Sequence, residues 1–169
     1  SIVLSAVLVF VVSSIIHMVM TYHRKDHRAL PDEEAVRAAL GRQTLTKGQY
    51  FIPHAPDMKA MKDPDMQKKF TEGPVAIITV LRSGLPNMGT HLIQWFLYSL
   101  GIAFVVAYVL SRTVAAGAPY MHVFCVASTI AWLGYAGGHV WAGIWKGVPW
   151  STVLKDVFDA FLFALVTGG

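Results

Sequence analysis

Residues 1–22, SIVLSAVLVFVVSSIIHMVMTY, form a mostly apolar run that ends at the basic segment HRKDHR. A helix rises about 1.5 Å per residue, so about 20 apolar residues cross the hydrocarbon core of a bilayer. The run is longer than the apolar part of a secretory signal, and no small-residue cleavage site precedes the charges. It is therefore predicted to be a transmembrane helix whose basic end faces the cytoplasm.

The composition separates this chain from ordinary globular proteins. Of its 169 residues, 54% are hydrophobic and 14% are charged, against about 25% charged residues in a typical soluble domain. Acidic residues are interleaved with the basic ones, which leaves no basic stripe for nucleic acid. The single cysteine, Cys125, excludes a disulfide framework. Because the chain begins and ends inside apolar runs, we expect it to be a piece of a longer protein.

Three more apolar stretches predict three more transmembrane helices, at residues 89–111, at 119–145 and from 149 onward. The expected fold is an all-α membrane protein with four transmembrane helices. Its predicted parts are a first transmembrane helix at 1–22, a cytoplasmic loop segment at 23–88 and a three-helix transmembrane region at 89–169.

The distribution of basic residues predicts the orientation in the membrane. Of the 14 Lys and Arg residues, only Arg112, Lys146 and Lys155 lie outside the stretch from Arg24 to Arg82. With that stretch in the cytoplasm, Arg112 alone falls on the outer side, and both termini are predicted there. Four tryptophans then fall near the inner interface, where indole rings are favoured: Trp95, Trp141, Trp145 and Trp150.

The loop segment is patterned rather than featureless. PDEEAVRAALGR predicts a short helix with Pro31 at its first position and Gly41 at its end. DPDMQKKF predicts a second, with Asp63 as the N-cap. QYFI and VAIITVL are short β-branched or aromatic runs flanked by Gly or Pro, and they are expected to pair as a hairpin.

Small residues recur every four positions in two of the predicted spans. Such rows let transmembrane helices approach closely, so we expect the second and third spans to touch along them. The rows are Ser99, Ala103, Ala107 and Ser111, and Gly134, Gly138 and Ala142.

Three histidines are predicted to share one depth near the inner face. They are His17, His91 and His139, each from a different span. Neutral imidazole is an axial ligand of haem and a common metal ligand, so they are candidate cofactor-binding residues, with His17 and His139 as the pair for a haem b. The alternative is interfacial histidines bonded to backbone or headgroups, and no cofactor is expected on that interpretation.

Two other sets of possible metal ligands have weaker support. His23 and His27 stand four apart, but the neighbouring Arg24, Lys25 and Arg28 would repel a cation, which favours a basic end that binds lipid headgroups. A second set could suit copper, although it lies in a loop predicted to be cytoplasmic: His54, Met58, Met61 and Met66.

Asp159 is the most costly residue in the predicted spans, because a carboxylate about 15 Å along a transmembrane helix is penalised unless it is paired or protonated. Lys155 lies one turn earlier on the same face. We expect an intramembrane ion pair between Lys155 and Asp159. The alternative is a proton- or ion-handling carboxylate that faces His139, His17 or a partner subunit.

Two segments resemble a family of small four-helix bacterial membrane proteins whose function is uncharacterised. They are PNMGTHLIQWFLYSL (86–100) and IWKGVPWSTVLKDVFDAFLFAL (144–165), and the resemblance covers most of the chain from about Tyr50 onward. It implies a multi-pass protein of a bacterial cytoplasmic (inner) membrane, and it brings no functional residues with it.

The sequence contains no nucleophile elbow, P-loop, HExxH or GxGxxG motif. The leading hypothesis is therefore a non-catalytic membrane protein, either an accessory or structural subunit of a larger membrane complex or a homo-oligomer. Its expected partners are membrane lipids and other membrane subunits or further copies of itself, and not nucleic acid. The alternatives are a haem- or metal-binding electron-transfer protein and a small proton-coupled transporter that uses Asp159.

Overall fold

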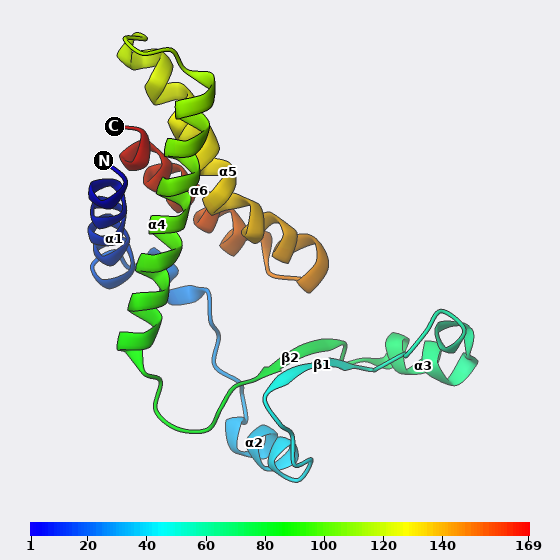
Figure 1. The fold of residues 1–169 in the computed structure, drawn as a ribbon. Helices are drawn as coiled ribbons and strands as arrows, with labels where there is room; N and C mark the ends of the chain where they lie inside the picture. The colour runs from blue at the N-terminus through cyan, green and yellow to red at the C-terminus, as the bar shows by residue number, and fades with distance from the viewer. The chain divides into compact units, whose positions relative to one another are not determined.

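The computed structural model describes residues 1–169 and divides them into two compact units. The first, here called the helical unit, consists of Ser1–Arg28 and Asn87–Gly169. The second, here called the inserted unit, is Ala29–Pro86. The chain is mostly helical with one two-stranded sheet (Figure 1).

Four long helices build the helical unit: α1 (Ile2–Met18), α4 (Met88–Thr113), α5 (Tyr120–Lys146) and α6 (Trp150–Gly168). α5 and α6 pack against each other most extensively, α1 lies against both α4 and α6, and α4 also contacts α5. Alanines and a few larger side chains fill the core, as expected where helices approach closely. The best-buried members include Ala127, Ala131, Ala160, Ala164, Val9 and Phe163.

Local signals set the helix ends around the two short turns. The Asn87 side chain caps α4 by accepting a hydrogen bond from the Thr90 N–H at 3.2 Å. α5 and α6 each begin directly after a proline, Pro119 and Pro149. α5 ends at Lys146 and is followed by Gly147, whose left-handed φ of 67° suits glycine. α5 and α6 therefore form an antiparallel pair joined by a three-residue turn, residues 147–149.

Two helices, not four, are long and apolar enough by themselves to cross a membrane, and these are α4 and α5. α1 is apolar but spans 17 residues. α6 has 19 residues, three of which are charged: Lys155, Asp156 and Asp159. Length and composition therefore support the predicted second and third spans and leave the first and fourth without that support.

The first helix is shorter than predicted. It ends at Met18, and residues Tyr22–Lys25 form a separate 3₁₀ turn, η1. Residues 19–25, which were predicted to be the end of the span and the start of the basic segment, therefore form a short connection that runs toward α6.

The rows of small residues have different surroundings. Gly134 of α5 lies against α4, since an added Cβ would stand 3.3 Å from the Ile102 side chain. Gly138 has open space instead, and Ser99 and Ala103 are buried inside the helical unit. The expected contact between α4 and α5 is therefore present at Gly134 but does not follow both rows along their length.

The inserted unit contains the elements predicted for it. Its helices are α2 (Glu33–Gly41) and α3 (Pro64–Glu72), with a 3₁₀ turn, η2 (Ala60–Lys62), before α3. β1 (Gly48–Ile52) and β2 (Ala76–Val80) pair antiparallel, in a register that places Tyr50 opposite Ile78. The expected strand pairing and the Asp63 cap of α3 are confirmed.

One boundary of the inserted unit differs from the prediction. Asp32 is the N-cap of α2 and accepts a hydrogen bond from the Ala35 N–H at 2.9 Å, so Pro31 lies outside the helix. An aspartate side chain at the cap satisfies a free backbone N–H, which proline cannot do.

Candidate functional site

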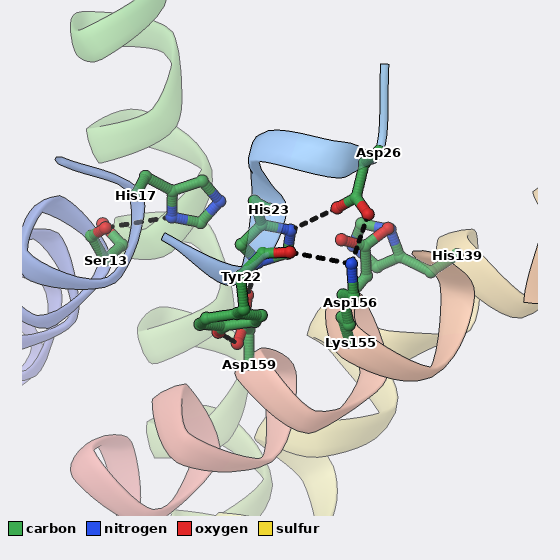
Figure 2. A network of polar contacts seen from close by, with 9 residues as sticks. All are labelled: Ser13, His17, Tyr22, His23, Asp26, His139, Lys155, Asp156 and Asp159. Carbon is green, nitrogen blue, oxygen red and sulfur yellow. Dashed lines mark hydrogen bonds and ion pairs between the residues drawn. The ribbon is translucent and has the colours of Figure 1, made fainter. Parts of the chain in front are cut away.

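A cluster of five polar residues joins η1 to α6 in the helical unit (Figure 2). It consists of Tyr22, His23, Asp26, Lys155 and Asp159, and it is called the polar cluster below. At its centre is Asp159, which is 2% exposed. The Tyr22 hydroxyl donates a hydrogen bond to one carboxylate oxygen of Asp159, and Nε2 of His23 lies 2.7 Å from the other. A carboxylate with this little exposure is tolerated because both of its oxygens are satisfied.

Lys155 contacts η1 and not Asp159. Its Nζ donates to the backbone carbonyl of Tyr22 at 2.8 Å and to Oδ1 of Asp26 at 2.5 Å. The direct ion pair expected between Lys155 and Asp159 is thus replaced by two contacts that cross from α6 to η1. The i,i+4 spacing places the two side chains on one face, but the returning η1 segment offers each of them a partner of its own.

His23 bridges the two carboxylates of the polar cluster, with Nδ1 2.7 Å from Oδ2 of Asp26. Burial alone would lower the pKa of His23, but its hydrogen bonds with Asp26 and Asp159 outweigh burial and raise the pKa above its usual value. The hydrogen bond from Lys155, joined by that from His23, lowers the pKa of Asp26. With His23 protonated, two cations balance two carboxylates.

A cavity of about 310 Å³ lies beside Asp159, at the lower end of the range for small-molecule pockets. Its polar lining includes His17 from α1, His139 from α5, and Asp156 and Asp159 from α6. Nδ1 of His139 lies 3.1 Å from Oδ2 of Asp156, which forms a second, more exposed histidine–carboxylate pair between α5 and α6. Four aromatic rings also line the cavity: Trp95, Tyr98, Tyr135 and Phe163.

His17 is oriented by the backbone of its own helix. Its Nδ1 lies 3.0 Å from the Ser13 carbonyl oxygen and, facing an acceptor, must carry the proton. Its ring is stacked on that of His23, with centroids 5.1 Å apart and planes 8° from parallel. The Ser13 hydroxyl in turn accepts a hydrogen bond from Nε1 of Trp95 at 2.8 Å, which ties α1 to α4.

The three histidines that were predicted to share one depth do not form one cluster. His17 and His139 line the same cavity, whereas His91 is exposed in the first turn of α4 and lines none of that cavity. His27 is exposed. The residues considered as copper ligands and disfavoured, from His54 to Met66, belong to the inserted unit.

Sequence reasoning missed Tyr22 and Asp26 as site residues. It considered His23 only together with His27 and favoured a basic end that binds lipid headgroups, because the segment HRKDHR has the composition of a solvated basic end. One signal could have found Asp26. Asp26 is the single acid in YHRKDHR, among five Arg, Lys or His residues. A partly buried lysine such as Lys155 requires an acid partner, and Asp26 could have been considered as one.

Comparison of the chain with family models, with curated proteins and with solved structures gives no match. The resemblance to small bacterial membrane proteins therefore stays a prediction, and function must be argued from the site and the surface.

Proposed function

We propose that this chain is a small non-catalytic integral membrane protein that acts as a subunit of a membrane assembly, formed with other proteins or with further copies of itself. One observation carries the proposal: the apolar side chains of α4 and α5 face outward. In their most apolar 18-residue stretches, only 17% and 22% of the residues are buried. In a soluble protein the core helices bury such residues.

The outward-facing residues are large. Leu97 and Phe104 of α4 are 58% and 60% exposed, and Leu133 of α5 is 66% exposed. Many large apolar side chains exposed on the same helices require lipid or another apolar protein surface to cover them. Lipid covers these side chains if the helices cross a bilayer. We include α1 and α6 among the proposed transmembrane helices because they pack against α4 and α5.

The polar residues of the helical unit favour the same arrangement. Three exposed tryptophans flank the turn between α5 and α6, where indole rings would sit at a membrane interface: Trp141, Trp145 and Trp150. The charges of α6 lie in its first ten residues, near that same turn, and the stretch after Asp159 is apolar. We propose that the turn between α5 and α6 lies on the cytoplasmic side of a bacterial inner membrane and that both termini lie on the outer side. The basic residues that follow α1 favour the same orientation.

Small residues on the outer surface favour an oligomer or a complex over a monomer in lipid. A side chain added at Gly101 of α4 or Gly137 of α5 would meet no atom within 4 Å, and both glycines are exposed. Such positions let a helix from another chain approach closely, where dispersion contacts replace the hydrophobic drive that lipid removes.

Alkaline carbonate extraction followed by cysteine labelling tests the membrane part. The chain should stay in the membrane pellet, and its release into the supernatant would overturn the proposal. In a Cys125→Ser background, an impermeant maleimide should label Ala115→Cys in intact cells and label Gly48→Cys only after lysis. The reverse pattern would invert the orientation.

The mass of the protein in mild detergent tests the assembly part. We expect a particle containing more than one 18.5 kDa chain or a stoichiometric partner. Gly101→Leu should weaken this association, because the leucine keeps the facing helix away. Val105→Leu, a change between two large residues on the same helix, is the matched control. A parent protein that is a single chain alone contradicts the assembly part and leaves the membrane part standing.

A further inference from the structure

We propose that His17, His23 and Asp159 bind one divalent transition-metal ion of the zinc class. The three side chains come from α1, η1 and α6, and one ligand atom from each lies within 4.8 Å of the others (Figure 2). This metal-site proposal does not depend on whether the protein works in an assembly. It also differs from the histidine set expected from depth, because it replaces His91 and His139 with His23 and Asp159.

The donor set has the composition of known metal sites. Two imidazoles and one carboxylate bind catalytic zinc and non-haem iron, and they leave coordination positions open for water. In a tetrahedral zinc site with bonds of about 2.1 Å, ligand atoms stand ~3.4 Å apart. Nε2 of His23 and Oδ2 of Asp159 are 2.7 Å apart. The exposed His17 ring can close the remaining distance by a small rotation, and the adjacent cavity supplies room for water.

The second nitrogen of each imidazole is held as metal sites require. A ligating histidine donates its other ring N–H to a carbonyl or carboxylate, which fixes the tautomer and orients the free nitrogen. Nδ1 of His17 has the Ser13 carbonyl as its acceptor, and Nδ1 of His23 has Asp26. Nε2 is left as the ligand atom in both, and Asp159 is oriented by the Tyr22 hydroxyl.

A cluster that served only to pair charges would leave His17 without a role. His23 alone bridges the two carboxylates, whereas the side chain of His17 makes one hydrogen bond, to its own helix, and has no acidic partner. Its ring is nevertheless stacked in parallel on His23, with the second nitrogen turned toward that residue in Figure 2. A shared ion accounts for this placement.

The nearby positive charges do not exclude a cation. The ammonium group of Lys155 is held by Asp26, and the side chains of Arg24 and Lys25 are exposed and screened by solvent. When the ion binds, the proton between Nε2 of His23 and Asp159 is released to solvent, as is general for histidine ligands.

A zinc titration of the purified full chain tests the site. The protein, in mild detergent and with any affinity tag removed, is stripped with a chelator and titrated with Zn²⁺. We expect one Zn²⁺ per chain. His17→Ala should lower the affinity by about 100-fold or more, since loss of an outer partner of a ligand alone costs about 10–100-fold. His27→Ala, which removes an exposed histidine from the same segment, should bind as the parent does.

A second variant guards against an effect of His17→Ala on folding. His17→Phe keeps an aromatic ring to stack on His23 but has no ligand nitrogen, so it should lose binding equally. Co²⁺ in place of Zn²⁺ should give the visible absorption of a coordinated ion in the parent and in His27→Ala, and not in either His17 variant. The absence of saturable binding in the parent, or parent-like binding in both His17 variants, would overturn the site.

Discussion

The helical unit and the inserted unit are held together by contacts of different range. Every buried residue of the chain lies in the helical unit, where side chains meet partners up to 137 residues away in the sequence. The inserted unit buries no residue below the surface and depends on helix caps within three residues and on one antiparallel strand pair. Its stability is therefore local, while that of the helical unit is shared among all four long helices.

This difference predicts how each unit responds to damage. A change at a long-range contact of the helical unit should lower the stability of the whole unit, because folding of such a core is cooperative. A change in the inserted unit should remain confined to one element. The following variants test that contrast in order of expected effect.

Asp159→Ala should have the largest effect. It removes the buried acceptor for the Tyr22 hydroxyl and for Nε2 of His23 and leaves these two partly buried donors without a partner, at a cost of about 3–5 kcal/mol. Thermal unfolding of the helical unit in detergent measures the loss. Asp156→Ala is the control. The side chains of Asp156 and His139 are 24% and 46% exposed, so their ion pair should be worth less than about 1 kcal/mol. Equal losses for the two variants would mean that the polar cluster does not stabilise the fold.

Gly143→Leu should be next. A Cβ at Gly143 of α5 would stand 3.0 Å from a methyl group of Val153, which is 1% exposed and cannot move aside. Overpacking of this contact between α5 and α6 should cost about 1–3 kcal/mol. Gly138→Ala, in open space on the same helix, should be neutral or stabilising by up to about 1 kcal/mol. The two unfolding temperatures should therefore move in opposite directions or differ clearly.

Asp63→Ala should have the smallest effect on the whole protein. It removes the N-cap of α3 and should cost about 1 kcal/mol of local helix stability. Amide hydrogen exchange should quicken in Pro64–Glu72 while the unfolding temperature of the helical unit stays unchanged. Asp63→Asn, which keeps a capping oxygen, should exchange as the parent does. A matching fall in the unfolding temperature would show that the two units are coupled.

A double-mutant cycle sharpens the partner assignment inside the polar cluster. Lys155→Met and Asp26→Asn should be strongly non-additive in thermal unfolding, because these two side chains touch. Lys155→Met and Asp159→Asn should couple less, because Lys155 contacts Tyr22 and Asp159 contacts His23 rather than each other. Stronger coupling in the second cycle would restore the direct Lys155–Asp159 pair.

Sequence reasoning succeeded where the deciding interactions are local. The Asp63 cap lies beside the helix that it starts, and the β-branched run containing Ile77 and Ile78 indicates its strand by composition. The long apolar runs of α4 and α5 likewise predict those helices to within a few residues. In each case the signal and its structural consequence lie within one element.

The polar cluster could not be predicted, for the same physical reason. Lys155 and Asp159 are four residues apart, so helix periodicity suggests that they pair. Whether they do depends on η1, a 3₁₀ turn more than 120 residues earlier, and periodicity carries no information about a contact of that separation. The early end of α1 at Met18, which frees η1 to reach α6, is likewise a tertiary effect.

The separation between Tyr22 and Asp159 also orders events during synthesis. A ribosome adds about 5–20 residues per second, so the 137 residues between these partners take roughly 7–30 s to be translated. For that interval the end of α1 lacks its partners in α6, whereas the inserted unit is complete as soon as Pro86 has been added. Completion of the helical unit therefore depends on α6, the last of its four long helices to be made, and a chain halted before α6 would present His23 without Asp159 and Asp26 without Lys155.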